Sequence, residues 1–350
     1  EARYLGTRGV HLLTQNRINR QPKASPEIGG LPTFLQRPSQ AQLDALTLTL
    51  NQIEARSSFV PRFADAGFNG ANLVGFLSNG NSTYHGASVQ LIRRFADNFQ
   101  TSAAYTWSHL IDDTTAEVFS TVLSPRRVED FQNLRAERAD SALDRRHRFV
   151  LSSIYELPFF RNSENGFVRT VLGGFQLAGT YTFESGQKAT VLSGIDANRN
   201  GDAAADRTIR NPAGVRDTAS TVSALTNSAG RVVGYLADNP QAEYIQTGLG
   251  AVSNSARNTL QLPSINNLDF SVFKNFRFGE NKRVQLRADF FNAFNHAQYI
   301  PGSPNDVAPI DSVAVGQVNT IFAGNTDFNR PQNVFSSNPR VIQMALRFDF

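Results

Sequence analysis

The last residues of the chain, Pro339-Arg340-Val341-Ile342-Gln343-Met344-Ala345-Leu346-Arg347-Phe348-Asp349-Phe350, decide its fold. Every second side chain from Ile342 to Phe350 is large and apolar, and the side chains between them are mostly polar. This period of two predicts a β-strand with one apolar face and one polar face. The apolar face needs a cover, which is either another layer of the protein or the lipid of a membrane.

The composition restricts the choice between these covers. The 350 residues are 40% hydrophobic, with a mean hydropathy of −0.31, and no stretch of 18 or more apolar residues predicts a transmembrane helix. A membrane β-barrel still fits, because every second residue of its strands faces the interior. The absence of cysteine excludes disulfides and cysteine metal sites. The net charge of +4, without clustered basic residues, gives no support for nucleic-acid binding.

The same alternation recurs along the chain. Strands are predicted at 83–95, 99–109, 148–159, 174–187, 267–278 and 283–294, and residues 1–5 read as the end of another strand. Short turns at 96–98, 161–169 and 279–282 alternate with long loops at about 6–80, 110–144, 193–263 and 295–337. Compact soluble domains rarely carry several loops of this length, whereas outer-membrane barrels combine short periplasmic turns with long extracellular loops.

The sequence therefore predicts an all-β fold, an incomplete antiparallel transmembrane β-barrel with about eight strands of a larger barrel. On the last strand, outer-membrane lipid would cover Ile342, Met344, Leu346, Phe348 and Phe350, and the lumen would receive Gln343, Arg347 and Asp349. A soluble β-sandwich is the alternative, but it must explain why the four long loops all fall on one side. Inside the first loop, the leucines and isoleucine of 40–56 fit either a short amphipathic helix or an irregular segment.

Several stretches resemble the barrel region of TonB-dependent receptors, in particular the Oar-like group common in acidobacteria. They are Ser82-Thr83-Tyr84-His85-Gly86-Ala87, Tyr105-Thr106-Trp107-Ser108, Asn133-Leu134-Arg135-Ala136-Glu137-Arg138, Asp144-Arg145-Arg146-His147-Arg148-Phe149, Tyr155-Glu156-Leu157-Pro158-Phe159, Asp289-Phe290-Phe291-Asn292-Ala293-Phe294-Asn295-His296 and Arg347-Phe348-Asp349-Phe350. The resemblance implies a barrel of about 22 strands with an N-terminal plug that contacts the TonB complex. It also implies that Phe348 and Phe350 form a signal for the barrel assembly machinery.

The resemblance also bears on the extent of the chain. The sequence starts with Glu1 and has no signal peptide, and residues 1–5 continue a strand that is already under way. We expect residues 1–350 to be the C-terminal part of one outer-membrane barrel domain, with the plug and the other N-terminal domains absent. Such a chain would not transport a substrate by itself, because the plug couples substrate release to TonB.

A cation-binding pattern occurs in the third long loop. Oxygen-bearing side chains at Asp196, Asn198, Asn200 and Asp202, with Gly201 at the sixth position, imitate the calcium loop of an EF-hand. The pattern departs from that loop at the twelfth position, which is Arg207, although Asp206 offers a carboxylate one residue earlier. The alternative is a polar turn that binds no metal. Ca²⁺ is the one cofactor that the sequence suggests.

Other polar clusters indicate structure more than chemistry. The segment Asp144-Arg145-Arg146-His147-Arg148 is either an anion-binding rim or the salt-bridged start of a strand, with Glu137, Asp140 and Asp144 as partners of the arginines. Asp269, Arg287 and Asp289 would form a salt-bridge ladder facing the lumen. Motifs of serine hydrolases, zinc proteases and phosphate loops are absent from the sequence, so we expect no enzymatic activity.

Two hypotheses for function follow from these patterns. In the first, the protein lies in the outer membrane of a Gram-negative bacterium and serves TonB-dependent uptake of large substrates, to which it contributes barrel wall and ligand-binding loops. In the second, an outer-membrane barrel serves adhesion, surface attachment or protein secretion without active transport. An extracellular soluble β-domain is the third and weakest reading.

Overall fold

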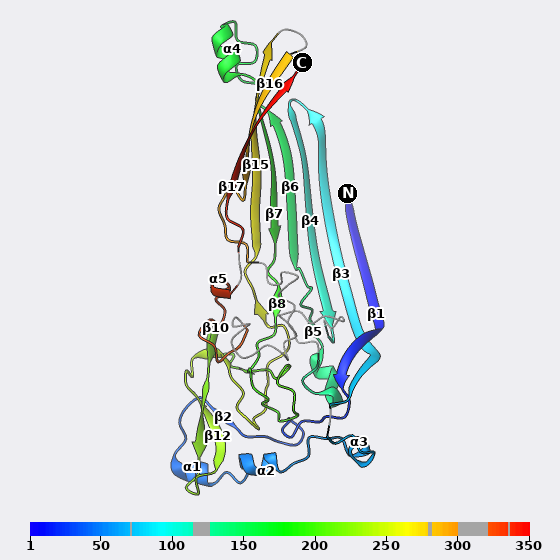
Figure 1. Cartoon of the computed structure of the whole chain (residues 1–350), viewed down its shortest axis with the longest axis vertical. Coiled ribbons are helices and arrows are strands. Elements are labelled where there is room, and N and C mark those ends of the chain that lie inside the picture. The colour runs from blue at the N-terminus through cyan, green and yellow to red at the C-terminus, as the bar shows by residue number, and fades with distance from the viewer. Residues whose placement is uncertain (71, 115–126, 279–281, 300–320, 335–336) are drawn as a thin grey trace.

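One antiparallel sheet forms the frame of the protein in the computed structural model (Figure 1), which describes residues 1–70, 72–114, 127–278, 282–299, 321–334 and 337–350. Its long strands are β1 (Ala2–Arg17), β3 (Val74–Ala96), β4 (Phe99–Asp112), β6 (His147–Glu156), β7 (Phe175–Glu184), β15 (Ile265–Phe278), β16 (Lys282–Phe291) and β17 (Val341–Asp349). They pair in this order, and the short β5 (Ala139–Asp140) joins β4. Within the described residues, β1 and β17 are the two ends of the sheet.

The pairing of β16 with β17 sorts the side chains as the alternation predicts. Four apolar pairs share one face, namely Val284 with Phe348, Leu286 with Leu346, Ala288 with Met344 and Phe290 with Ile342. The other face holds Arg283 opposite Asp349, Gln285 opposite Arg347 and Asp289 opposite Gln343. On the apolar face Met344 is 82% exposed and Phe348 is 62% exposed, so no layer of the described protein covers it.

The same two faces continue across the sheet. Apolar or aromatic pairs such as Val89 with Tyr105, Leu151 with Tyr181 and Val272 with Leu177 extend the apolar face. The opposite face carries small polar pairs, such as Ser88 with Thr106 and Ser152 with Thr180. A sheet with one mostly apolar, uncovered face is suited to contact lipid on that side.

Lys274 is a charged residue on the apolar face. It lies opposite Leu286 on one neighbouring strand and Phe175 on the other. Its ammonium group donates to the carbonyl of Gly173 and lies 4.6 Å from the ring centroid of Phe175. The long side chain thus carries its charge along the apolar surface to a polar partner just before the start of β7.

The strand ends differ at the two ends of the sheet (Figure 1). At the end near the C-terminus, which we call the turn end, β3 and β4 are joined by Asp97 and Asn98, both with positive φ. The connection from β6 to β7 there includes helix α4 (Gly166–Leu172), where a plain turn at 161–169 was predicted. Most of the predicted turn at 279–282 lies outside the described residues.

The opposite end of the sheet carries a folded region that we call the loop assembly, formed by the described residues of 18–73, 113–146, 185–264 and 292–340 (Figure 1). Its elements are β2 (Thr33–Phe34), α1 (Gln40–Asp44), α2 (Leu50–Glu54), α3 (Pro61–Asp65), η1 (Phe131–Glu137), β5, β8 (Lys188–Ala189), β9 (Ile209–Arg210), β10 (Val215–Ser220), β11 (Val222–Thr226), β12 (Val232–Ala237), β13 (Ala242–Ile245), β14 (Leu260–Gln261) and α5 (Pro331–Val334).

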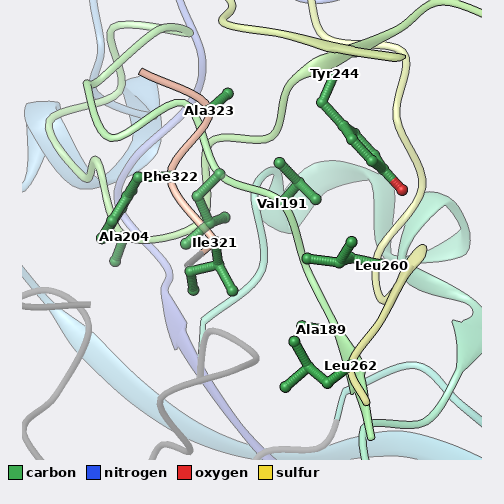
Figure 2. Packing of buried hydrophobic residues seen from close by; sticks show 10 residues of the cluster. Ala189, Val191, Ala204, Tyr244, Leu260, Leu262, Ile321, Phe322 and Ala323 are labelled. Atoms are coloured by element: carbon green, nitrogen blue, oxygen red, sulfur yellow. The ribbon is translucent and has the colours of Figure 1, made fainter. Parts of the chain in front are cut away.

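The buried apolar core lies in this loop assembly. Its largest cluster brings together Val191, Leu192, Tyr244, Leu260 and Ile321, each at most 1% exposed (Figure 2). A second cluster packs Ile53 of α2 against Leu31, Tyr235 and their neighbours. Segments that are far apart in the chain therefore form a packed unit.

Two predictions for residues 6–80 differ from the structure. The loop expected from residue 6 to 80 begins only after Arg17, because β1 and β3 pair from Ala2–Val89 to Arg17–Val74. A register shift near His11, whose φ is 56°, breaks the alternation there. The helix considered for 40–56 is divided into α1 and α2, each started by a capping box, from Ser39 and from Thr49.

The helices of the protein are short. In the part of the chain that the structure describes, no helix has the length and apolarity needed to cross a membrane.

Candidate functional site

The loop assembly contains a pocket of about 250 Å³. Four separate segments line it, from residues 22–27, 129–137, 197–207 and 247–256. The second segment includes η1, and the third and fourth belong to the long connection between β7 and β15. Because the segments are distant in sequence, the pocket exists only when the loop assembly is folded.

The pocket is acidic. Glu27, Glu129, Asp130 and Glu137 line it together with one cation, Arg207. Burial raises the pKa of Asp130, and the nearby carboxylates of Glu27, Glu129 and Glu137 raise it further. Such a lining suits a ligand with hydroxyl or cationic groups more than an anion.

A buried network of ion pairs supports the pocket wall. Arg207, which is 6% exposed, binds Glu129 at 2.7 Å and Glu137 at 2.8 Å. Although burial lowers the pKa of Arg207, the two carboxylates hold it above its usual value. Arg257, 3% exposed, donates to Asp112 at the end of β4 and to the backbone carbonyl of Glu137. The network therefore connects the pocket to the long antiparallel sheet. Sequence reasoning missed it, because its members are separated by up to 145 residues.

The predicted calcium loop forms a tight turn next to this pocket. The carboxylate of Asp196 accepts the backbone N–H groups of Asn200 at 3.0 Å and Gly201 at 2.9 Å. Asn198 Oδ1 accepts the N–H of Asn200 at 2.9 Å, and Asn200 Oδ1 accepts the N–H of Asp202 at 2.7 Å. Gly201 has a φ of +85°, which glycine adopts without steric cost.

The structure separates Asp202 from the other residues of the predicted site. Its carboxylate receives two hydrogen bonds from Arg127, at 2.5 and 2.9 Å, and an ion pair from Arg17 at 3.0 Å. These guanidinium groups already balance its charge. Within the described residues, no three His, Cys, Asp or Glu side chains are grouped in a way that would hold a metal ion. Any cation site here must therefore include the asparagine oxygens.

Asp206 is the most deeply buried acid of this loop, with 0% exposure. Its Oδ1 accepts the backbone N–H of Asn198 at 3.2 Å, and Oδ2 has no hydrogen-bond partner in the described part of the chain. Burial raises the pKa of Asp206 well above its usual value, and the neighbouring carboxylates of Glu129 and Asp196 raise it further. Burial also raises the pKa of Asp196.

The charged segment before β6 forms ion pairs with neighbouring side chains. Arg146 pairs with Asp140 at 3.4 Å and with Asp144 at 3.2 Å, as expected for a salt-bridged start of a strand. Arg145 instead binds Glu184 of the next strand at 2.7 Å. Glu137, expected as a partner of these arginines, belongs to the network of Arg207 and Arg257.

The salt-bridge ladder predicted on the polar face of the sheet forms only in part. Arg287 binds Asp289 at 2.7 Å, and Asp289 also accepts the hydroxyl of Ser271 at 2.5 Å. Asp269 accepts the backbone N–H of Asn292 at 2.9 Å instead of joining the ladder. A hollow of about 330 Å³ on this face is lined mainly by small and polar residues of β4, β6, β7, β15 and β16.

One protein family matches nearly the whole chain. The model of the family described as "Outer membrane beta barrel domain" matches residues 1–343. No curated protein matches the chain. The crystal structure of the outer membrane transporter YddB from Escherichia coli aligns with 100% of this chain and 30% of that transporter, with 10% sequence identity and a TM-score of 0.36. The chain thus spans less than a third of the length of that transporter. The match over nearly its whole length shows that the chain belongs to the family of outer-membrane β-barrel domains and is located in the cell outer membrane.

Proposed function

We propose that the protein supplies barrel wall and ligand-binding loops to a TonB-dependent receptor of the Oar-like type for energy-coupled uptake of large substrates. The observation that carries this proposal is the folded loop assembly, which holds an acidic pocket at one end of an amphipathic sheet. A porin-like wall needs no such unit, whereas a receptor must bind its substrate selectively before moving it. The small polar side chains of the sheet would then line the path.

In this proposal the loop assembly faces the outside of the cell and the turn end faces the periplasm. The substrate binds in the acidic pocket, and TonB, driven by the proton gradient of the inner membrane, acts on a plug domain to open the path. The acidic lining favours polyhydroxyl or cationic substrates. The alternative is adhesion, surface attachment or secretion, for which the packed cores of the loop assembly would provide a stable outer surface.

Uptake measurements separate these functions. Cells carrying the protein would be offered fluorescein-labelled oligosaccharides and basic oligopeptides that are too large for porins. We expect one probe class to accumulate inside, and we expect deletion of TonB or addition of a protonophore to stop accumulation while leaving binding at the surface. Accumulation that is insensitive to both treatments, or surface attachment without any accumulation, would contradict the proposal.

A pair of variants connects the pocket to binding. Glu129→Gln removes a carboxylate that lines the pocket, so probe binding should weaken several-fold. The control is Asp65→Asn, because Asp65 is exposed and lies outside the pocket lining. If the two variants bind the probe equally well, the pocket is not the binding site. That result would not test the dependence of uptake on TonB.

We also propose that the end of β17 is read by the barrel assembly machinery. Phe348 and Phe350 are 62% and 101% exposed on the last strand, so both rings are accessible. Deleting Phe350 should lower the amount of inserted protein several-fold, as measured in purified outer membranes, and leave probe binding per inserted molecule unchanged. Normal insertion of the truncated protein would show that the terminal ring is not the signal.

A further inference from the structure

The inference concerns the turn at 196–206 and is independent of the proposed uptake function. In this turn, side-chain oxygens are held in fixed directions by contacts with their surroundings. The Nδ2 groups of Asn198 and Asn200 both donate to the backbone carbonyl of Glu129, each at 3.2 Å. The amide oxygens of both residues therefore point away from Glu129 and back into the turn, where each accepts one backbone N–H. A carbonyl oxygen has two lone pairs, so each retains one for a further partner.

Asp206 supplies the second, independent observation. The hydrogen bond from Asn198 to its Oδ1 sets this carboxyl group against the same turn, while Oδ2 is buried without a partner in the described residues. Glu129, Asp196 and Asp202 act on this carboxyl group as like charges, and Arg199 and Arg207 act on it as opposite charges. A buried carboxylate oxygen that has no donor and lies near three other acids is costly, unless a cation binds to it.

Among the described residues, the arginines of the region form their ion pairs with carboxylates other than Asp206. Arg127 and Arg17 are bound to Asp202, and Arg207 is bound to Glu129 and Glu137. Arg199 lies 3.6 Å from Asp196, but its Nε donates to Glu54 at 2.6 Å. The turn therefore combines anionic and neutral oxygens with an unsatisfied buried oxygen.

We propose that this turn binds one Ca²⁺ ion through side-chain oxygens of Asp196, Asn198, Asn200 and Asp206. Two carboxylates and two amide oxygens are ligands typical of Ca²⁺, which accepts six to eight oxygens in variable geometry, with water and backbone carbonyls completing the set. Mg²⁺ fits less well, because it demands a strict octahedron and releases its water reluctantly. The carboxylate of Asp202 is excluded from the set, since it is held by Arg127 and Arg17.

The ion would fix one wall of the acidic pocket. Asn198 lines the pocket, and both asparagine amides bind the backbone of Glu129, which also lines it. Binding of Ca²⁺ to the turn would thus hold residues 129 and 198 in place. Removal of the ion would loosen this wall while leaving the membrane sheet unchanged.

Calorimetric titration of Ca²⁺ into the full chain, refolded in detergent and freed of metal with a chelator, tests the proposal. We expect binding of one ion per chain, at least tenfold weaker binding by the Asp206→Asn variant, and weaker binding of Mg²⁺ than of Ca²⁺. The matched control, Asp65→Asn, removes an exposed carboxylate of the loop assembly and should bind Ca²⁺ like the wild type.

Hydrogen exchange of the wild-type protein keeps the test informative if Asp206→Asn fails to fold. Ca²⁺ should slow exchange of amides in residues 196–208 at least tenfold relative to the chelator-treated protein, with no change in β3 or β4. Absence of calorimetric binding, or exchange that is the same with and without Ca²⁺, would overturn the proposal. Unchanged affinity in a folded Asp206→Asn protein would also overturn it.

Discussion

The loop assembly buries its apolar side chains, whereas the sheet leaves those of one face exposed. In the loop assembly, Val191, Leu192 and Leu260 are 0% exposed and pack against one another. On the sheet, Leu91 is 67% exposed and Met344 is 82% exposed, although these side chains are just as apolar. The difference shows that the two regions have different solvents. The loop assembly folds against its own core in water, and the sheet leaves its apolar face for lipid.

The two regions also use charge differently. The loop assembly buries complete ion pairs, such as Arg207 with Glu129 and Glu137. The apolar face of the sheet carries Lys274 only where its ammonium group can reach the carbonyl of Gly173. Substitutions should therefore damage one region without damaging the other, and three predictions test this separation.

The largest effect is expected from Glu137→Gln in the loop assembly. Glu137 is 2% exposed and contacts both Arg207 and Arg257, so the variant leaves two buried guanidinium groups with too little negative charge. We expect a loss of about 3–5 kcal/mol in the free energy of unfolding of the loop assembly. Protease susceptibility in increasing denaturant would measure it, while the strand signal in circular dichroism should persist.

Its control is Arg216→Gln, since the side chain of Arg216 is 82% exposed in its ion pair with Asp217. That variant should change stability by about 0.5 kcal/mol or less. If both variants behave alike, the buried network does not hold the loop assembly together. If Glu137→Gln also unfolds the sheet, the two regions are not separable.

An intermediate effect is expected on the sheet from Leu286→Arg. Leu286 lies on the apolar face opposite Leu346, so the variant places a charge against lipid. The cost should be about 2–4 kcal/mol if the residue lies near the middle of the bilayer. The neighbouring Arg287→Leu is the matched control on the polar face. Unfolding in lipid vesicles measures both, and greater damage from Arg287→Leu would mean that the faces are assigned in reverse.

The smallest effect is expected from Thr49→Ala at the start of α2. The Thr49 hydroxyl accepts the N–H of Gln52 and holds the helix that carries the buried Ile53. Loss of the cap should cost about 1 kcal/mol and appear as faster hydrogen exchange in residues 50–55. The exposed Thr226→Ala should leave exchange in α2 unchanged. Faster exchange along β16 instead would contradict the separation of the two regions.

The sheet could be predicted from the sequence because its faces repeat every two residues. The prediction was wrong where this repeat is broken, as at the register shift near His11 that hid most of β1. In the loop assembly the apolar side chains do not follow such a two-residue repeat. The pairs Ser39 with Gln42 and Thr49 with Gln52 are recognisable as capping boxes in the sequence, and they would have placed α1 and α2.

The candidate site was predicted only in its local part. The turn at 196–206 is visible in the sequence because its residues are adjacent, and its binding of calcium stays a prediction. The contact of Arg127 with Asp202 joins residues that are 75 positions apart. The sequence therefore did not indicate that an arginine binds the carboxylate of Asp202. The acidic pocket was missed for the same reason, since four distant segments form it.

The length of the apolar face also bears on how the sheet sits in the bilayer. On β15 this face includes Leu268, Phe270 and Val272, and it continues past Lys274 to Phe276, which lies opposite Val284. The eight steps from Leu268 to Phe276 span roughly 20 Å along the membrane normal, given about 3.3 Å per residue and a strand tilt of about 35–45°. This length is close to the apolar band of about 25 Å seen in outer-membrane barrels. The headgroup layer would then lie near the start of β15, next to the loop assembly.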